Sequence, residues 1–475
     1  MKDKKRTFET FFFYDRSGME ARFEQMAAKG WLIEAINSSI CTYRRIEPKK
    51  LTFCVCWYPD ASQFDPGPSE KQQTFYDFCQ HTGWVLAVSS GPMQVFYNEN
   101  EHPIPIETDP VLEVEAIHRS MTRGPLPGQV CFLGLAVLNL WLFVSRLLDD
   151  PLDTLASTLN LIPGLLWFDL ILILAVECGG YLLWHRKAAK AAQEGDFLKT
   201  NRRKGVRRFV LALLALNLLC FLIHLINAMA YGSSVTRYTS LIMFLVYLPG
   251  VFLLTYGVRA LLKKKKYPAH INRAATFTTS LVVAFLFLFC ITWGTLAGTT
   301  RGWFTEKGVE TYTYHGATFT APQDELPLTI KDLTHETREG YSREKRVESS
   351  PFLAQYQMRE RPRFDAANFA ELPALEYTIT VVKLTSLYDL CKNELLEGWT
   401  REWQEEGEKD YAEPVSPAPW GADDAYQQYN QEYGAQNTFL LCYDKRLVEI
   451  SFPNEWTLTP EQMKMVSEKL RTFEN

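Results

Sequence analysis

Long stretches of apolar residues without charge follow one another in the middle of the chain, separated by short polar links. Residues 209–236, 238–258 and 274–300 contain no Asp, Glu, Lys or Arg. A helix needs about 20 mostly apolar residues to cross a hydrocarbon core of about 30 Å. Five stretches in series meet that length, which predicts a five-helix transmembrane region over 128–297, with spans at about 128–148, 158–184, 209–231, 239–262 and 275–297.

The charges of the links predict how these helices are oriented. The links 185–208 and 263–274 are rich in Lys and Arg, whereas 149–157 contains three Asp and neither Lys nor Arg. Basic links of multi-pass proteins stay on the cytoplasmic side. We therefore expect a bacterial plasma-membrane protein with its N-terminus inside and, after five crossings, residues 301–475 outside.

Residues 1–100 are expected to form a cytoplasmic α+β domain built from a repeated strand-helix-strand-strand unit. Gly30–Trp31 and Gly83–Trp84 lie 53 residues apart, each between an amphipathic helical stretch and an alternating strand pattern. Glycine ends a helix in the left-handed conformation, and the tryptophan anchors the next strand. The pattern predicts first strands at 11–14 and 51–58, one sheet of about six strands, and both helices on one face. Residues 101–127 are interpreted as a linker, in which 109–121 could form an amphipathic helix that lies on the membrane or docks on the domain.

The run FFFYDRSGMEARFEQMAAKGWLIEAI, together with TYRRIEP, GWVLAV and MQVFYNE and the apolar region behind them, resembles a bacterial membrane family catalogued as domain of unknown function 2812. The similarity is specific over about residues 8–100. The resemblance implies no catalytic residues, because the family has no established activity. It also implies that the gene often lies beside PadR-like transcriptional repressors.

Ionisable and amide residues inside the predicted spans are candidates for a functional role, because placing them in hydrocarbon is costly. They are Asp169, Glu177, His224 and Asn139. Asp169 and His224 are expected at comparable depths and could meet across a helix interface, and Asn217 falls at a depth similar to that of Glu177. A structural role in holding helices together is the alternative to an ion or proton pathway.

Residues 301–475 are predicted to form a second α+β domain. Strands are expected at 311–320 and 375–384, a helix at 386–403, a hairpin about Asp444-Lys445, and a helix that starts at Thr459. Cys391 and Cys442 could form a disulfide or remain buried thiols. Tyr426, Tyr429 and Tyr433 have helical spacing and follow Trp420, so these four aromatic residues are interpreted either as core or as a binding face for a peptide or envelope glycan.

No sequence motif predicts an enzyme. The sequence contains no Gly-rich phosphate loop, no nucleophile elbow and no His-Glu-x-x-His motif. His315 and His335 are only weak evidence for a metal site. We expect no metal and no cofactor, and the net charge of −5 does not favour nucleic acid. The predicted function is regulatory or sensory, within the cell envelope. The expected partners are membrane lipid, a cytoplasmic protein and an external peptide or envelope ligand. The alternative is a transporter subunit or ion pathway that uses Asp169, Glu177 and His224.

Overall fold

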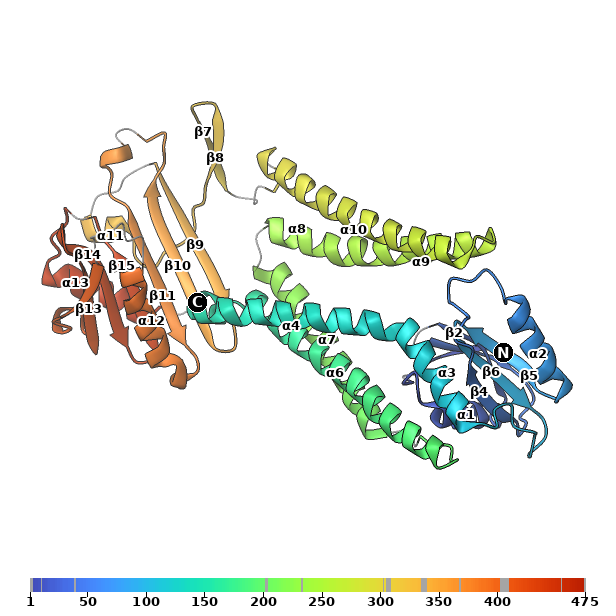
Figure 1. The fold of residues 1–475 in the computed structure, drawn as a ribbon. Coiled ribbons are helices and arrows are strands. Elements are labelled where there is room, and N and C mark those ends of the chain that lie inside the picture. Colours follow the sequence, from blue (N-terminus) through green and yellow to red (C-terminus); the bar gives the residue numbers. More distant parts are fainter. Residues whose placement is uncertain are drawn as a thin grey trace. The chain divides into compact units, whose positions relative to one another are not determined.

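The computed structural model describes most of the chain, and Figure 1 shows its elements. The described residues are 3–9, 11–37, 40–200, 204–231, 234–301, 303–304, 309–334, 340–366, 369–401, 410–453 and 455–473. The chain has an N-terminal region with two small sheets, five long apolar helices and a C-terminal sheet-rich region. It forms two compact units, each described by itself below. One holds Met1–Leu140, Leu166–Cys220 and Leu241–Trp293, and the other holds Trp141–Leu165, Phe221–Ser240 and Gly294–Asn475.

The N-terminal domain is a duplicated unit, as the repeat predicts. The first copy consists of β1 (Lys4–Phe8), α1 (Arg16–Ala27), β2 (Trp31–Asn37) and β3 (Ile40–Arg45). The second consists of β4 (Thr52–Trp57), α2 (Glu70–His81), β5 (Val85–Ser90) and β6 (Met93–Asn98). Both sheets have the same antiparallel order, β1-β3-β2 and β4-β6-β5.

Local irregularities repeat as well as the regular elements. Gly30 and Gly83 both have positive φ, at 79° and 87°, after their helices. The second strand of each copy carries a register shift, between Ile33 and Ala35 in β2 and between Leu86 and Val88 in β5. These shifts are again 53 residues apart. Because bulges are conserved features of a fold rather than accidents, they support a true duplication.

Three details of the predicted domain are wrong. The strands form two three-stranded sheets instead of one six-stranded sheet, with β2 and β5 side by side. Strand β4 is buried on both faces: Phe53 and Val55 share a core with α1, whereas Cys54 and Cys56 share a core with Cys79 of α2. The two helices therefore cover opposite faces of the second sheet. The first strand is Lys4–Phe8, and residues 11–14 form an irregular segment with a turn.

The expected linker contains a helix that belongs to the N-terminal domain. Helix α3 (Pro110–Arg123) starts at the N-cap Asp109, whose side chain accepts a hydrogen bond from Val111 N. Ile117 and Met121 of α3 are buried in the core that also contains α1 and β4. Of the two expectations for this segment, docking on the domain is the one the structure supports.

The apolar helices are longer than the sequence patterns that predict them. They are α4 (Pro125–Asp149), α6 (Thr158–Gln193), α7 (Lys204–Tyr231), α8 (Ser234–Ile242) continued through the π-helix η1 (Met243–Tyr247) and α9 (Leu248–Lys264), and α10 (Ala269–Thr300). By length and composition, these helices give five candidate membrane spans within the described part of the chain. At about 1.5 Å per residue, the 36 residues of α6 extend for about 54 Å, which is more than a hydrocarbon core needs.

The C-terminal region contains a seven-stranded antiparallel sheet of order β12-β13-β14-β15-β11-β10-β9. The strands are β9 (Tyr341–Ser349), β10 (Leu353–Pro362), β11 (Leu375–Val382), β12 (Asp410–Val415), β13 (Asp424–Asn430), β14 (Gly434–Tyr443) and β15 (Arg446–Ser451). The expected hairpin about Asp444-Lys445 is β14–β15. The residues 311–320 form a separate hairpin, β7 (Glu310–Tyr314) and β8 (Ala317–Ala321), instead of one strand. It turns at His315 and Gly316, which both have positive φ.

Helices cover both faces of this sheet. On one face, α11 (Ile330–Thr334) and α13 (Pro460–Arg471) pack around Trp420 and Ile450. The capping box predicted at Thr459 is formed with Gln462. On the other face lie α12 (Tyr388–Arg401) and the short helix α5 (Pro151–Ala156), which links α4 to α6. The acidic link between the first two apolar helices is thus part of the C-terminal core.

Candidate functional site

Tyr14 lies in the segment between β1 and α1 and packs on the C-terminal half of α6. Its ring stacks on Trp184, with 5.4 Å between the ring centroids, and lies 6.2 Å from the ring of Tyr181. Both partners are buried in the core of the N-terminal domain. Gly180 lies directly under the Tyr14 hydroxyl, and a Cβ at that position would collide with it. The last turns of α6 therefore form part of the domain's core.

Helix α3 contacts the same end of α6. The His118 Nδ1 atom lies 2.6 Å from the Tyr181 hydroxyl oxygen, and the rings of His118 and His185 are 4.4 Å apart. Since α3 leads directly into α4, these contacts tie the first apolar helix and the second to one domain. We call the contact surface formed by Tyr14, His118, Tyr181 and Trp184 the α6 joint.

A half-buried guanidinium next to this joint gathers three carboxylates. Arg16, the first residue of α1, donates from Nε to Glu20 Oε1 at 2.9 Å and also binds Glu113 of α3. Glu107, from the segment before α3, lies 3.5 Å from an Arg16 Nη atom. Glu20 also accepts from Val55 N of β4 at 2.9 Å. One side chain thus connects α1, the segment before α3, and α3 itself; we call this group the Arg16 cluster.

Burial gives the cluster unusual protonation behaviour. Burial raises the pKa of Glu107 to about 7; Arg16 opposes that shift, and the nearby Glu113 and Glu20 carboxylates add to it. The pKa values of Glu20 and Glu113 are also raised, chiefly by burial. Burial alone would lower the pKa of Arg16, but the surrounding carboxylates raise it further above its usual range. One cation therefore faces three carboxylates, and Glu107 is protonated in part of the molecules near neutral pH.

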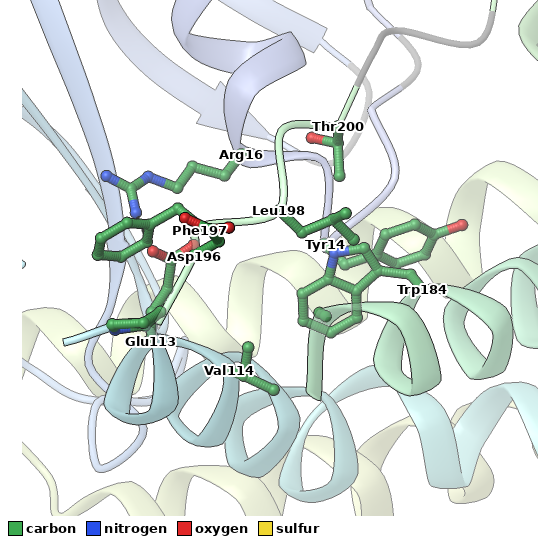
Figure 2. Close-up of a pocket in the computed structure, with 11 residues that line it drawn as sticks. Tyr14, Arg16, Glu113, Val114, Trp184, Asp196, Phe197, Leu198 and Thr200 are labelled. Carbon is green, nitrogen blue, oxygen red and sulfur yellow. Dashed lines mark hydrogen bonds and ion pairs between the residues drawn. The ribbon is translucent and has the colours of Figure 1, made fainter. Parts of the chain in front are cut away.

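The segment after α6 closes over the cluster. Phe197 lies against the Arg16 guanidinium at 5.9 Å from its ring centroid, and Thr200 N donates to Ser17 Oγ at 3.3 Å. Figure 2 shows the small pocket that results, where Phe197 lies beside Arg16 and Leu198 lies near Tyr14 and Trp184. Its volume is about 10 Å³, which is about the space of one water molecule. The cluster is therefore a packed junction rather than a substrate cavity.

The second copy of the repeat makes an equivalent contact with other helices. Phe64 lies in the segment between β4 and α2, the counterpart of the segment that holds Tyr14. Its backbone oxygen accepts from Asn272 Nδ2 of α10 at 3.0 Å, and Asn272 is fully buried. Arg273 lies over the Phe64 ring at 5.7 Å, and Arg259 of α9 donates to Gln63 Oε1 at 3.1 Å. We call this contact the α9–α10 joint.

The predicted polar residues within the helices have defined surroundings. Asp169 on α6 is 2% exposed, and its Oδ2 accepts from Asn217 Nδ2 of α7 at 3.4 Å. Glu177 on α6 accepts from Gln129 Nε2 of α4 at 2.6 Å. Asn139 donates to Leu135 O of its own helix. His224 lies on α7, and its meeting with Asp169 stays a prediction.

Cys391 and Cys442 lie in one core cluster of the C-terminal region, and both are buried free thiols in the structure. Cys391 is on α12 and Cys442 is on β14. Burial raises the pKa of each thiol to about 11, so neither is a thiolate at neutral pH. The disulfide between them stays a prediction.

The helical face predicted for the tyrosines is wrong, because Tyr426 and Tyr429 belong to strand β13. Tyr426 packs on the core shared with α12, whereas Tyr429 stacks on Tyr411 of β12. Trp420 is buried against Phe439 and Phe452 on the other face of the sheet, and Tyr433 is 70% exposed in a turn. These side chains do not form one surface, and a ligand-binding role for any of them stays a prediction.

Sequence reasoning missed the α6 joint and the Arg16 cluster, although one signal for them was available. Four consecutive residues of the run YDRSGME make these contacts. Tyr14 belongs to the α6 joint, Asp15 caps α1, and Arg16 is the centre of the Arg16 cluster. Ser17 accepts a hydrogen bond from the segment after α6. Gly18 leaves the space that the Asp15 carboxylate occupies. Among the described residues, no group of three or more His, Cys, Asp or Glu could hold a metal ion. His315 lies in the β7–β8 turn, and His335 is outside the described residues.

Comparison with known proteins supports the predicted resemblance. Residues 15–123 match a family model described as "Protein of unknown function (DUF2812)". Curated proteins and solved structures gave no match to this chain. The matched segment begins at the N-cap of α1 and ends at the last residue of α3, so it contains the whole Arg16 cluster. From Asp15 to Arg123, the chain is therefore similar to this family of unknown function.

Proposed function

We propose that this chain is a regulatory or sensory protein of the bacterial cytoplasmic membrane, whose duplicated N-terminal domain responds to rearrangement of the apolar helices. The observation that carries the proposal is the pair of equivalent joints. The same segment of each repeat, between its first strand and its helix, binds a different group of helices: Tyr14 binds α6, and Phe64 binds the first turn of α10. If α6 moved relative to α9 and α10, the contact between the two copies of the repeat would be strained.

The C-terminal region supplies the other half of the proposed coupling. Helix α5 is buried in its core through Leu152 and Ala156, and Thr158 Oγ1 donates to Ser349 O at 2.7 Å. Ser350 Oγ donates to Leu155 O in the same segment. Helix α6 starts at Thr158, contains Pro163 near its start, and extends as one helix to the residues of the α6 joint. A ligand on the C-terminal region could therefore bias the N-terminal domain if it favours one of two positions of α6.

The charge pattern supports opposite sides of the membrane for the two regions. The N-terminal domain contacts α6 and α10 beside the basic links. Its core includes α6 residues as far as Ala188, and Phe64 accepts a hydrogen bond from Asn272 of α10. The C-terminal region binds the acidic link before α6. Basic links are retained in the cytoplasm, so the proposal keeps the N-terminus inside and residues 301–475 outside. A cytoplasmic protein partner, an external peptide or glycan, and a gene next to a PadR-like repressor belong to the same proposal.

Hydrogen exchange of the full-length protein in lipid nanodiscs tests the coupling. Because coupling free energy is reciprocal, loosening either joint should change the exchange rates in α5 and β10 as well as in the N-terminal domain. The variants are Tyr14→Ala and Phe64→Ala. The control is Phe78→Ala, because Phe78 of α2 is 58% exposed. Changes confined to residues 3–123 would rule out the coupling.

A transporter or ion pathway is the second candidate, and the buried Asp169 favours it. A carboxyl group that is 2% exposed and bound to Asn217 of the next helix is a common element of proton relays and of helix packing alike. Asp169→Asn keeps the shape and removes the charge. A transport role requires that solute or proton flux into proteoliposomes falls in this variant, and unchanged flux in a stably folded variant removes the transport proposal.

A further inference from the structure

An apolar cavity lies between α6, α7 and the segment that carries Tyr14. Its volume is about 460 Å³, and its walls include Val176, Leu183, Val206 and Phe209. Gly179 and Gly205 line it too, and a Cβ at either position would meet no atom within 4 Å. The backbone of both helices is thus open to an occupant. The Tyr14 ring borders this cavity as well as the α6 joint.

Basic side chains flank the cavity at one end. On a helix, residues three and four positions apart lie on the same face. Arg186 and Lys187 therefore lie on the same face of α6 as the cavity-lining Leu183, toward the C-terminal end of the helix, and both are exposed. Glu177, the acidic residue within the stretch of α6 that lines the cavity, accepts a hydrogen bond from Gln129 of α4. An apolar cavity with positive charge at one end is complementary to a molecule with an apolar tail and an anionic head.

We propose that this cavity binds one anionic phospholipid of the surrounding membrane, with an acyl chain along Gly179 and Gly205 and its phosphate beside Arg186 and Lys187. Basic pockets between membrane helices at the cytoplasmic surface recognise anionic headgroups in this way. A bound chain would contact Tyr14, so the lipid would stabilise the α6 joint. The inference shares the membrane location with the proposed function but does not depend on coupling to the C-terminal region.

Photoaffinity labelling of the full-length protein tests the lipid site. The probe is a phosphatidylglycerol with a photoreactive group on one acyl chain, in nanodiscs of phosphatidylcholine. Labelling of residues 175–209 is expected, and unlabelled phosphatidylglycerol should compete much better than phosphatidylcholine. Replacing Arg186 by Gln should weaken binding about fivefold, which is the effect expected for one basic residue near an anionic headgroup.

Two glycine substitutions distinguish lipid bound in the cavity from lipid that merely surrounds the helices. Gly179→Leu fills the cavity and should abolish the labelling of residues 175–209. Gly257→Leu is the matched control, because Gly257 is an exposed glycine of α9 with no atom within 4 Å of its added Cβ. Thermal unfolding in the same nanodiscs confirms that both variants are folded. Equal labelling in Gly179→Leu and in the unchanged protein, or equal competition by the two lipids, would overturn the lipid site, whereas the hydrogen-exchange test of coupling would be unaffected.

Discussion

At the scale of single residues, the Arg16 cluster makes stability depend on pH. The pKa of Glu107 is raised to about 7 from its ordinary value of 4.5, so between these values the folded protein binds more protons than the unfolded chain. The contribution of Glu107 to stability should therefore fall as pH rises from about 5 to about 8. Glu107→Gln should remove part of this slope and stabilise the protein at pH 8, by a few kcal/mol at most. Thermal unfolding of the full-length protein, followed by tryptophan fluorescence from pH 5 to 8.5, measures both effects.

The control for this prediction is Glu101→Gln. Glu101 is exposed, and the pKa of its carboxyl is lowered by its hydrogen bond to Lys50 and by the charge of that lysine. Removing it should leave the slope between pH 5 and pH 8 unchanged. If Glu107→Gln has the same pH profile as Glu101→Gln, ionisation of Glu107 does not influence stability.

Alanine substitutions at two neighbouring glycines of α6 distinguish the effect of the Tyr14 contact on stability from the effect of helix propensity. A Cβ at Gly180 would collide with the Tyr14 hydroxyl, whereas a Cβ at Gly179 would meet no atom within 4 Å. Alanine stabilises a helix by about 1 kcal/mol relative to glycine, and overpacking costs about 1–3 kcal/mol. Gly180→Ala should therefore unfold at a lower temperature than Gly179→Ala and exchange amide hydrogens of residues 11–14 faster. Identical behaviour of the two variants would show that Tyr14 does not pack on α6 in solution.

Few of these site residues could have been predicted one by one. Asp169 and Glu177 are visible in sequence because a charge inside an apolar stretch is conspicuous, but their partners Asn217 and Gln129 depend on which helices are neighbours. Arg16 is an ordinary residue in an ordinary amphipathic helix. Its importance comes from Glu107 and Glu113, which are about 90 residues away in sequence, and no local pattern encodes that contact.

At the scale of elements, α5 should be essential for the C-terminal core. Leu152 is 7% exposed and packs in the cluster that contains Leu353 and Trp399. Replacing a buried leucine by alanine costs about 2–5 kcal/mol, so Leu152→Ala should lower the unfolding temperature of this region and make β10 more susceptible to proteolysis. Leu148→Ala is the control, because Leu148 of α4 is 73% exposed. Equal stability of the two variants would show that α5 is not part of the core.

The elements were predictable where one physical signal dominates. The capping box at Thr459 and the Gly30 and Gly83 helix ends depend on neighbouring residues only, and the structure confirms them. The prediction of a shared helical face for Tyr426 and Tyr429 was wrong because a spacing of three residues also occurs in a strand. In a strand this spacing places the side chains on opposite faces. Strand β4 has near-continuous burial, and that pattern does not reveal that its two faces pack on different helices.

At the scale of the whole molecule, the described residues contain five candidate membrane spans, and their orientation is open to direct measurement. Apolar length is encoded locally, so all five helices were predictable from sequence; the joints were not, because they depend on which surfaces meet after folding. The distribution of Lys and Arg predicts that the N-terminus lies inside. In spheroplasts of a bacterial host, an epitope tag after Asn475 should be destroyed by added protease, and a tag before Met1 should be lost only after the membrane is permeabilised.

Neutralising the lysines of one basic link tests whether charge causes this orientation. Replacing Lys263–Lys266 by Gln removes four positive charges from the link between α9 and α10 without changing either apolar stretch. Positive charges in short links determine which side each helix end reaches, so a fraction of the molecules should expose the 263–268 link to the outside. A matched replacement of Asp149, Asp150 and Asp153 by Asn should leave the orientation unchanged, since acidic residues contribute little to orientation. Protection of the C-terminal tag in intact spheroplasts of the unchanged protein would contradict the five-crossing arrangement, and with it the proposal that the two regions communicate across a membrane.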